Sequence, residues 1–143
     1  HHFPRAFLEK GSLDFSFSGL KTSVRNMISK REELSGFILS DEDIAASFQS
    51  AVIEVLSTKL VLACKQQNIN RVVVTGGVAA NQALRQKVKV ECDKNDFQCF
   101  FPNLRYCTDN AAMIACAGYY NSCNSFPVVN SFLSLDASSV KSL

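Results

Sequence analysis

The order of hydrophobic and polar positions along the chain predicts helices that alternate with short strands. Polar and aromatic residues alternate over 14–17, which is typical of a half-buried strand, and Ser18 and Gly19 end that pattern. A helix is expected next, because apolar residues recur at helical spacing: Leu20, Val24, Met27 and Ile28. The periodicity then fades, so residues 32–40 are predicted to be a loop.

A long helix is predicted from Asp41 to about Gln67. Ser40 supplies a hydroxyl for the N-cap, and three acidic residues follow it at the positive end of the helix dipole. One apolar stripe continues through the segment: Ile44, Phe48, Val52, Val55, Leu56, Leu60 and Ala63. Residues 68–70 are expected to end this helix, and a strand over 71–75 to follow at once.

Two adjacent glycines, Gly76 and Gly77, are predicted to join that strand to a helix that ends near Asp93. Glycine lets the backbone turn sharply and approach a ligand, and the N–H groups of the next helix would face that ligand. The spacing matches neither Gly-x-Gly-x-x-Gly nor a P-loop. Two interpretations stay open, a plain tight connection and a nucleotide-binding turn. Asn81, expected one turn into the helix, either reads a ligand or bonds nearby backbone.

The C-terminal part predicts one more strand and one more helix. Residues 97–101 form a strand-like run that Pro102 stops, and Thr108 with Asp109 is a cap-and-acid helix start. The helix over 109–121 is apolar nearly all round and is therefore expected to be buried. A carboxylate in its first turn is costly to leave unpaired, so Asp109 is either a candidate for chemistry or a helix-dipole acid.

Composition fits one globular domain, with 143 residues, 47% hydrophobic and 20% charged. No continuous apolar run is long enough to span a bilayer and the N-terminus lacks a secretory pattern, so a soluble protein without a membrane role is expected. The six cysteines show no Cys-x-x-Cys or finger-like Cys/His spacing. This argues against a structural zinc site and favours small buried thiols in a reducing compartment.

The net charge of +2 does not by itself indicate a nucleic-acid binder. Positive residues nevertheless gather in two clusters: Lys21, Arg25, Lys30 and Arg31, and then Arg85, Lys87, Lys89 and Lys94. Each cluster is either a solvated helix face or a phosphate contact.

These elements predict an α/β fold, yet about two strands are too few to cover so many apolar helical faces. The chain is therefore expected to be part of a larger unit or to pack against a partner. Its two histidines lie at the N-terminus, so neither a Ser/His/Asp nor a Cys/His nucleophile is assembled.

Three blocks together resemble the C-terminal half of the TsaD family, the tRNA threonylcarbamoyladenosine transferases once called O-sialoglycoprotein endopeptidases. The blocks are Asp14 to Thr22 (DFSFSGLKT), Gly76 to Asn81 (GGVAAN) and Cys107 to Ala115 (CTDNAAMIA). The resemblance runs from about Phe3 to Tyr120, includes residues 43–49, and is closer to the bacterial and organellar branch.

The resemblance implies an actin-like ATPase (ASKHA) fold, here a helix-rich fragment with a small sheet that lacks the N-terminal lobe. Residues 1–123 would belong to the catalytic domain and 124–143 would form a Ser- and Asn-rich tail. The reaction would transfer threonylcarbamoyl from its adenylate, threonylcarbamoyl-AMP, to N6 of the adenosine beside the anticodon. Asn81, with Gly76 and Gly77, would bind the adenylate or ATP, and Asp109 would bind a divalent metal, either iron or a zinc- or magnesium-like ion.

No catalytic residue is assigned, because the family's metal site also needs a His-x-x-x-His pair from the absent lobe. The isolated chain is therefore expected to be inactive. Expected partners are tRNA and either accessory subunits or a homodimer mate, in the cytoplasm of a bacterium or in a mitochondrion or plastid. The alternative is a non-catalytic assembly module of the same fold. The old peptidase label lacks a nucleophile and zinc ligands. Ala111 replaces the family's usual glycine, a change that favours helicity.

Overall fold

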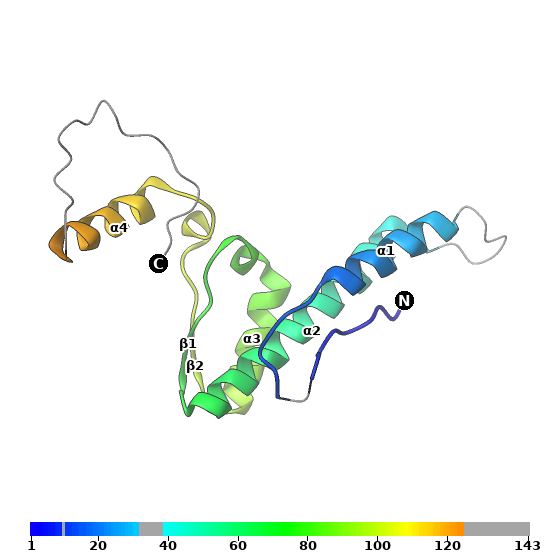
Figure 1. Ribbon diagram of the computed structural model, residues 1–143, viewed down its shortest axis with the longest axis horizontal. Helices are drawn as coiled ribbons and strands as arrows, with labels where there is room; N and C mark the ends of the chain where they lie inside the picture. Colours follow the sequence, from blue (N-terminus) through cyan, green and yellow to red (C-terminus); the bar gives the residue numbers. More distant parts are fainter. Residues whose placement is uncertain (10, 32–38, 125–143) are drawn as a thin grey trace. The chain divides into compact units, whose positions relative to one another are not determined.

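The computed structural model describes residues 1–9, 11–31 and 39–124 (Figure 1). The predicted tail from 125 on and most of the predicted 32–40 loop lie outside these residues. The chain divides into two compact units, residues 1–108 and 109–143, and each is described by itself. The elements of the first unit are α1 (Ser18–Arg31), α2 (Asp41–Gln67), β1 (Arg71–Val73), the 3-10 turn η1 (Gly77–Ala80), α3 (Gln82–Lys94), β2 (Gln98–Phe100) and the 3-10 turn η2 (Leu104–Tyr106). The second unit contains α4 (Ala111–Asn124).

Helix α2 begins and ends where the sequence predicts. The Ser40 hydroxyl accepts a hydrogen bond from the Asp43 backbone N–H at 3.1 Å, and the Asp43 carboxylate accepts one from the Ser40 N–H at 3.3 Å. These reciprocal bonds satisfy two N–H groups that the first helical turn leaves free. Asn68 ends the helix in the left-handed conformation (φ 53°), which a short polar side chain tolerates well.

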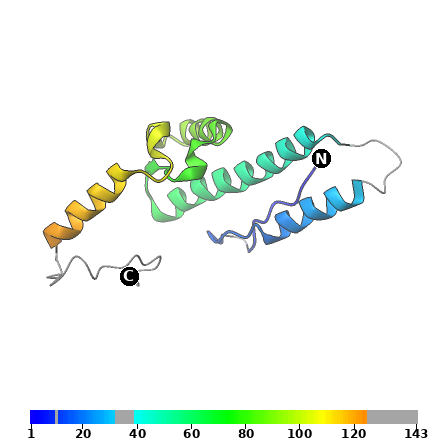
Figure 2. The same cartoon turned by 90° about the horizontal axis from the view of Figure 1, so that it is seen from above.

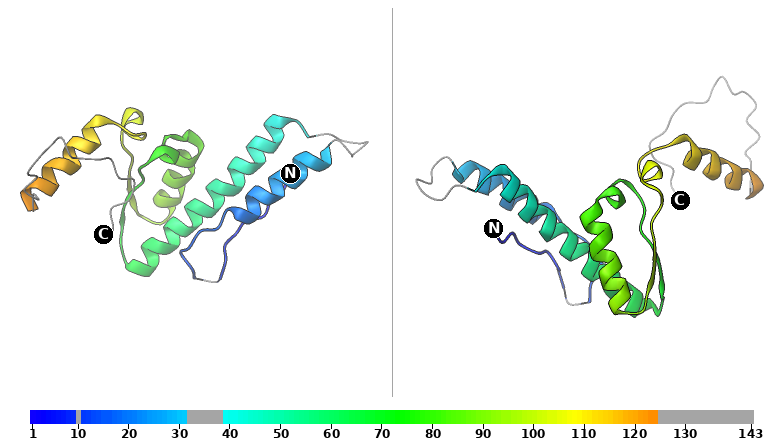
Figure 3. Two further views of the ribbon diagram at one scale, coloured as in Figure 1. Left: turned by 45° about the horizontal axis from the view of Figure 1, so that its top comes forward. Right: turned by 180° about the vertical axis from the view of Figure 1, so that it is seen from behind.

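Helix α1 lies beside one part of α2 and α3 beside another (Figures 2 and 3). Two hydrophobic clusters lie along α2, one toward each end. The first joins the N-terminal segment and α1 to α2: Phe3, Leu20, Ile44 and Ala51 are buried there. The second joins α3 and the strands to α2: Leu84, Val88 and Cys92 are buried, with Ile53, Leu56 and Leu60 packed on them. Because each cluster contains residues of α2, this helix carries both halves of the first unit.

The N-terminal segment is fastened to α2 by polar side chains. The Arg5 guanidinium pairs with the Glu54 carboxylate at 2.9 Å, and the Gln66 amide donates to the Gly11 carbonyl at 2.8 Å. Buried Lys59 donates to the Ser12 carbonyl at 3.0 Å and also to the Asp14 carbonyl. The prediction of a strand over 14–17 is wrong, since this segment pairs with no strand among the described residues and Lys59 takes one of its carbonyls.

The strands form a two-stranded parallel sheet in which Val72 lies opposite Cys99. Each strand has three residues, shorter than the predicted ranges 71–75 and 97–101. Val74, Cys99 and Phe101 pack against α3, whereas Val73 and Phe100 remain 70% and 51% exposed. A helix-rich α/β chain with a small sheet is therefore confirmed, and the sheet leaves apolar side chains uncovered.

Helix α2 is long and apolar enough, by length and composition, to cross a membrane, with a mean hydropathy of 1.3 over 18 residues. This finding does not conflict with the lack of a continuous apolar run, because a window average tolerates scattered polar residues. A helix that lies inside a folded protein passes the same test. Since α2 carries an ion-paired Glu54 and a buried, hydrogen-bonded Lys59, the finding is weak support for a membrane span.

Helix α4 differs from its prediction in two respects. It begins at Ala111. The Asn110 side chain accepts a hydrogen bond from the Met113 N–H at 2.9 Å, so the N-cap is Asn110 rather than Thr108. Residues 111–121 are exposed, so the expectation of a buried helix is wrong for this chain. Within the second unit, α4 is the only helix or strand among the described residues, so no other element of this unit packs on its apolar side chains.

The second cluster should determine the stability of the first unit. Leu84→Ala removes a side chain that is 4% exposed, so we expect a loss of about 2–5 kcal/mol in the free energy of unfolding. Val90→Ala, on the same helix but 48% exposed, is the matched control and should change it by less than about 0.5 kcal/mol. Urea unfolding followed by circular dichroism measures both. Equal losses in the two variants would contradict this assignment of the core.

Candidate functional site

The glycine turn lies at the carboxyl end of β1. The last backbone hydrogen bond between the strands runs from the Val74 N–H to the Phe100 carbonyl, at 3.0 Å, and the two segments then separate. Gly76 has φ 90°, a backbone conformation that is strained for residues with a side chain. Its carbonyl accepts a hydrogen bond from the Ala79 N–H at 3.0 Å. In parallel sheets, ligands bind beyond the carboxyl ends of strands, so the turn is in a suitable place for one.

The helix after the turn begins later than predicted. Gly77–Ala80 form η1, and α3 starts at Gln82 with Asn81 as its N-cap. The Asn81 Oδ1 accepts from the Leu84 N–H at 3.0 Å, and its Nδ2 donates to Gln49 Oε1 of α2 at 2.7 Å. Asn81 is thus a cap rather than a residue one turn inside the helix, and it makes the backbone contact that was one of its two interpretations.

The two glycines leave their surroundings open. Both are exposed, and a Cβ built at either would have no heavy atom within 4 Å. Gly77, unlike Gly76, has no positive φ. A methyl group at Gly77 is therefore compatible with the chain and would hinder only something that approaches from outside.

A cavity of about 330 Å³ lies beside this turn and is lined mainly by apolar side chains. Its cationic group, Lys59, is engaged with the Ser12 and Asp14 carbonyls, and the Lys59 ammonium lies 5.5 Å from the Phe15 ring centroid. The cavity therefore suits an apolar group better than a phosphate.

Asp109 is the first residue of the second unit, and it is exposed and precedes the α4 cap. The expectation of a buried acid in the first helical turn is therefore wrong, because α4 begins two residues later. Among the described residues, no group of three or more His, Cys, Asp or Glu side chains is arranged to hold a metal. One exposed carboxylate does not fit a catalytic metal by itself.

Three cysteines of the first unit are buried, and burial disfavours the nucleophilic thiolate form of two of them, Cys64 and Cys92. Burial raises the pKa of the Cys64 thiol and raises the pKa of Cys92 to about 11. The Cys92 thiol therefore stays protonated at neutral pH, while the nucleophilic form is the thiolate. Cys107 is 3% exposed and its thiol lies 3.7 Å from the Asn103 carbonyl.

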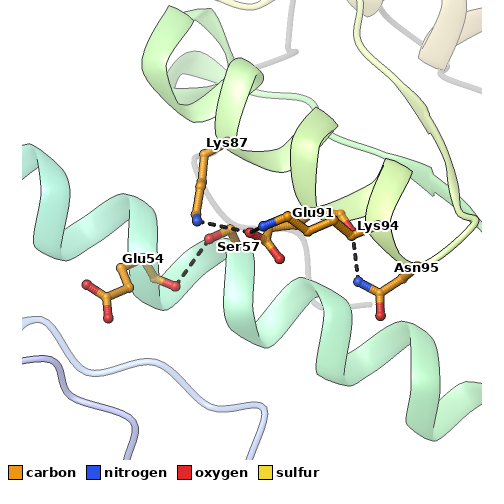
Figure 4. Close-up of polar contacts among 6 residues, drawn as sticks. All are labelled: Glu54, Ser57, Lys87, Glu91, Lys94 and Asn95. Carbon is orange, nitrogen blue, oxygen red and sulfur yellow. Dashed lines mark hydrogen bonds and ion pairs between the residues drawn. The ribbon is translucent and has the colours of Figure 1, made fainter.

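The two basic clusters differ in their surroundings. Figure 4 shows Lys87, Glu91 and Lys94 together on α3, where Glu91 pairs with Lys87 at 2.9 Å and with Lys94 at 3.1 Å. Hydrogen bonds from Lys87 and then Lys94 hold the pKa of Glu91 below its usual value. The α3 cluster is therefore partly neutralised. Of its other two members, Lys89 is exposed, while Arg85 is half-buried and turned toward the loop after β2.

Comparison with known proteins identifies relatives of this chain. Residues 1–116 match the TsaD family, described as tRNA N6-adenosine threonylcarbamoyltransferase. Proteins of that name in Staphylococcus haemolyticus, Clostridioides difficile and Desulfotalea psychrophila are 48%, 52% and 53% identical to the chain over 120, 122 and 120 residues.

The fold and turn define a helix-rich α/β protein with a candidate ligand site at the end of a parallel strand. The chain belongs to the TsaD family. The three relatives match 84%, 85% and 82% of this chain, while the chain spans 35%, 36% and 35% of their lengths.

The double role of Asn81 can be separated by substitution. Asn81→Ala removes the cap of α3 and should lower the free energy of unfolding by about 1 kcal/mol. Asn81→Asp also loses the donor to Gln49 but keeps an acceptor for the Leu84 N–H, so it should destabilise the protein less than Asn81→Ala, since Asp and Asn cap about equally well. Urea unfolding measures both, and equal losses would show that the cap contributes nothing.

Proposed function

We propose that this chain forms part of an enzyme that transfers threonylcarbamoyl from threonylcarbamoyl-AMP to N6 of the adenosine beside the anticodon of tRNA. Membership of the TsaD family supports the proposal. The structural observation that carries it is the exposed Gly76–Gly77 turn, which lies between the carboxyl end of β1 and the N-terminus of α3. Open backbone beside a helix N-terminus is a favourable place for a nucleotide phosphate.

In this proposal the chain binds and orients the adenylate. Asn81 has one N–H and one carbonyl lone pair engaged within the protein, so its amide keeps a second donor and a second acceptor for the nucleotide. The start of α3 favours the negative charge of the departing AMP. Because the exocyclic amine of adenosine is a weak nucleophile, holding the two reactants in place accounts for most of the rate.

Asp109 is proposed as one metal ligand, with the metal either iron or a zinc- or magnesium-like ion. We assign no step to that metal, because the described residues do not complete its site. The isolated chain is accordingly proposed to be inactive in transfer. Accessory subunits or a second copy would cover exposed apolar groups such as Val73 and Phe100. A cytoplasmic location is proposed for a bacterial protein and an organellar one for a eukaryotic protein.

The alternative function, a non-catalytic assembly module, is favoured by one observation. Helix α4 exposes Met113, Ile114, Tyr119 and Tyr120 by 47% to 65%, and a group of large exposed apolar and aromatic side chains is typical of an interaction surface. A chain that self-associates in sedimentation experiments and binds no adenylate would favour the module over the enzyme.

Gly77→Ala tests the proposed nucleotide site. The new methyl group meets no atom of the chain, so the free energy of unfolding should stay within about 0.5 kcal/mol of the wild-type value. The affinity for ATP and for threonylcarbamoyl-AMP, measured by titration calorimetry, should fall by at least about tenfold, or 1.4 kcal/mol. Gly118→Ala in α4 is the matched control, since its Cβ is equally free of contacts. Unchanged affinity in Gly77→Ala, or no binding by the wild type, would contradict the proposal.

Helix α1 is the better proposal for a contact with tRNA phosphates. It contains no acidic residue, and Lys21, Arg25 and Lys30 are exposed. No ion pair found among the described residues involves these three side chains. The α3 cluster, by contrast, shares Glu91 between two lysines and directs Arg85 inward. Positive charge gathered on one helix favours phosphate binding, because the release of counterions drives it.

Two double variants test this contact. Lys21→Ala with Arg25→Ala should weaken tRNA binding and lower the slope of log affinity against log salt by about 1.5, as expected for two lost phosphate contacts. Lys87→Ala with Lys94→Ala removes the same charge from α3 and should change the slope by less than about 0.5. Filter binding at several salt concentrations measures both slopes. The opposite ranking would assign the contact to α3.

A further inference from the structure

Arg85 contacts two segments that leave the sheet in different directions. Its Nε donates to the Ala79 carbonyl of η1 at 2.5 Å, and its Nη2 donates to the Pro102 carbonyl, in the loop after β2, at 2.8 Å. The same Nη2 lies 3.1 Å from the Cys107 sulfur, and the guanidinium carbon is 5.1 Å from the Phe101 ring centroid. One half-buried side chain thus joins the glycine turn to residues 101–107.

The two segments need such a link because the sheet ends before them. Backbone pairing between the strands stops at the Val74 N–H and the Phe100 carbonyl, and the chain then runs into the turn on one side and toward Thr108 and Asp109 on the other. The Arg85 side chain lies beyond this last backbone hydrogen bond and contacts both segments. Its position on α3 is fixed, since its N–H donates to the Asn81 carbonyl at 3.1 Å and neighbouring Leu84 is buried.

We propose that Arg85 is a positioning residue that sets the glycine turn and the 101–108 loop in one fixed arrangement. The role rests on the proposed function, because these segments carry the residues assigned to adenylate and lead to Asp109. Arg85 does not touch the adenylate in this scheme, and it acts through the backbone carbonyls of Ala79 and Pro102.

An arginine suits this position and a lysine does not. The guanidinium is planar and holds its donors in a fixed fork, so Nε and Nη2 reach two carbonyls in set directions while one face lies over an aromatic ring. A lysine ammonium keeps the charge but has a single donor atom, and it cannot reproduce the separation between the two donors.

The reactivity of Cys107 reports directly on this link. Three cysteines of the first unit are nearly inaccessible: Cys107 is 3% exposed, Cys64 7% and Cys92 0%. Alkylation by N-ethylmaleimide, with each site quantified by peptide mass spectrometry, follows all three in one sample. In Arg85→Lys we expect the Cys107 rate to rise at least about tenfold, as for the loss of a hydrogen bond to a charged donor. The Cys64 and Cys92 rates should not change.

Nucleotide binding supplies the second measurement. Arg85→Lys should weaken threonylcarbamoyl-AMP binding by about tenfold, although no atom of Arg85 is assigned to the ligand. In Arg85→Ala, added ethylguanidinium should restore part of the affinity and ethylammonium should not, since only the former reproduces the fork. Lys87→Ala, two residues away and exposed, is the control and should resemble the wild type in both measurements.

The outcomes separate this inference from the proposed function. A selective rise at Cys107, weaker binding and rescue by ethylguanidinium would support the positioning role. Equal rises at all three cysteines would show general destabilisation and would overturn it, as would an Arg85→Lys variant that resembles the wild type. Failure of the proposed function would appear differently, as a wild-type chain that binds no adenylate.

Discussion

The first unit depends on one constraint, which is that a single helix must serve two hydrophobic clusters at once. Residues of α2 near its start pack with α1 and Phe3, whereas residues further along pack with α3 and the strands. Polar side chains between these contacts are then free to hold the N-terminal segment. Two backbone carbonyls accept hydrogen bonds from the buried Lys59 ammonium, which offsets part of the cost of burying its charge. The helix therefore contributes apolar side chains to both clusters and polar side chains that hold the N-terminal segment, which explains why it contains residues of both kinds.

The positions of the residues in the candidate site depend on contacts with α2. Leu84 and Val88 fix α3 on α2, the amide of Asn81 reaches Gln49 of α2, and Arg85 extends from the same helix to the loop after β2. The glycine turn is itself exposed and has little packing of its own. Its conformation is thus set by residues that flank it, and this is the usual way in which a rigid scaffold presents an open ligand-binding backbone.

Elements with strong local signals could be predicted from the sequence. Neighbouring residues alone determine the Ser40 cap, the apolar stripe of α2 and the end of this helix at Asn68. The incorrect prediction of a strand over 14–17 could not be avoided from the sequence, because a strand forms only where another strand pairs with it. Here Lys59, distant in the chain, donates a hydrogen bond to the Asp14 carbonyl instead. The expected burial of α4 rested on its apolar composition alone, and the described residues of its own unit contain no second element to pack on it. Arg85 has the same sequence signal as an exposed lysine, so its inward contacts appear only in three dimensions.

The connection between the strands has a kinetic consequence. Strand β1, the glycine turn, α3 and β2 follow one another without interruption, so the contacts among them join residues close in sequence. Attachment of Phe3 and Ser12 to α2, in contrast, closes loops that contain α1. Because closing longer loops costs more entropy, we expect the strand–helix–strand unit to form early and the N-terminal segment to dock late. The glycine turn would then form before the first cluster is complete.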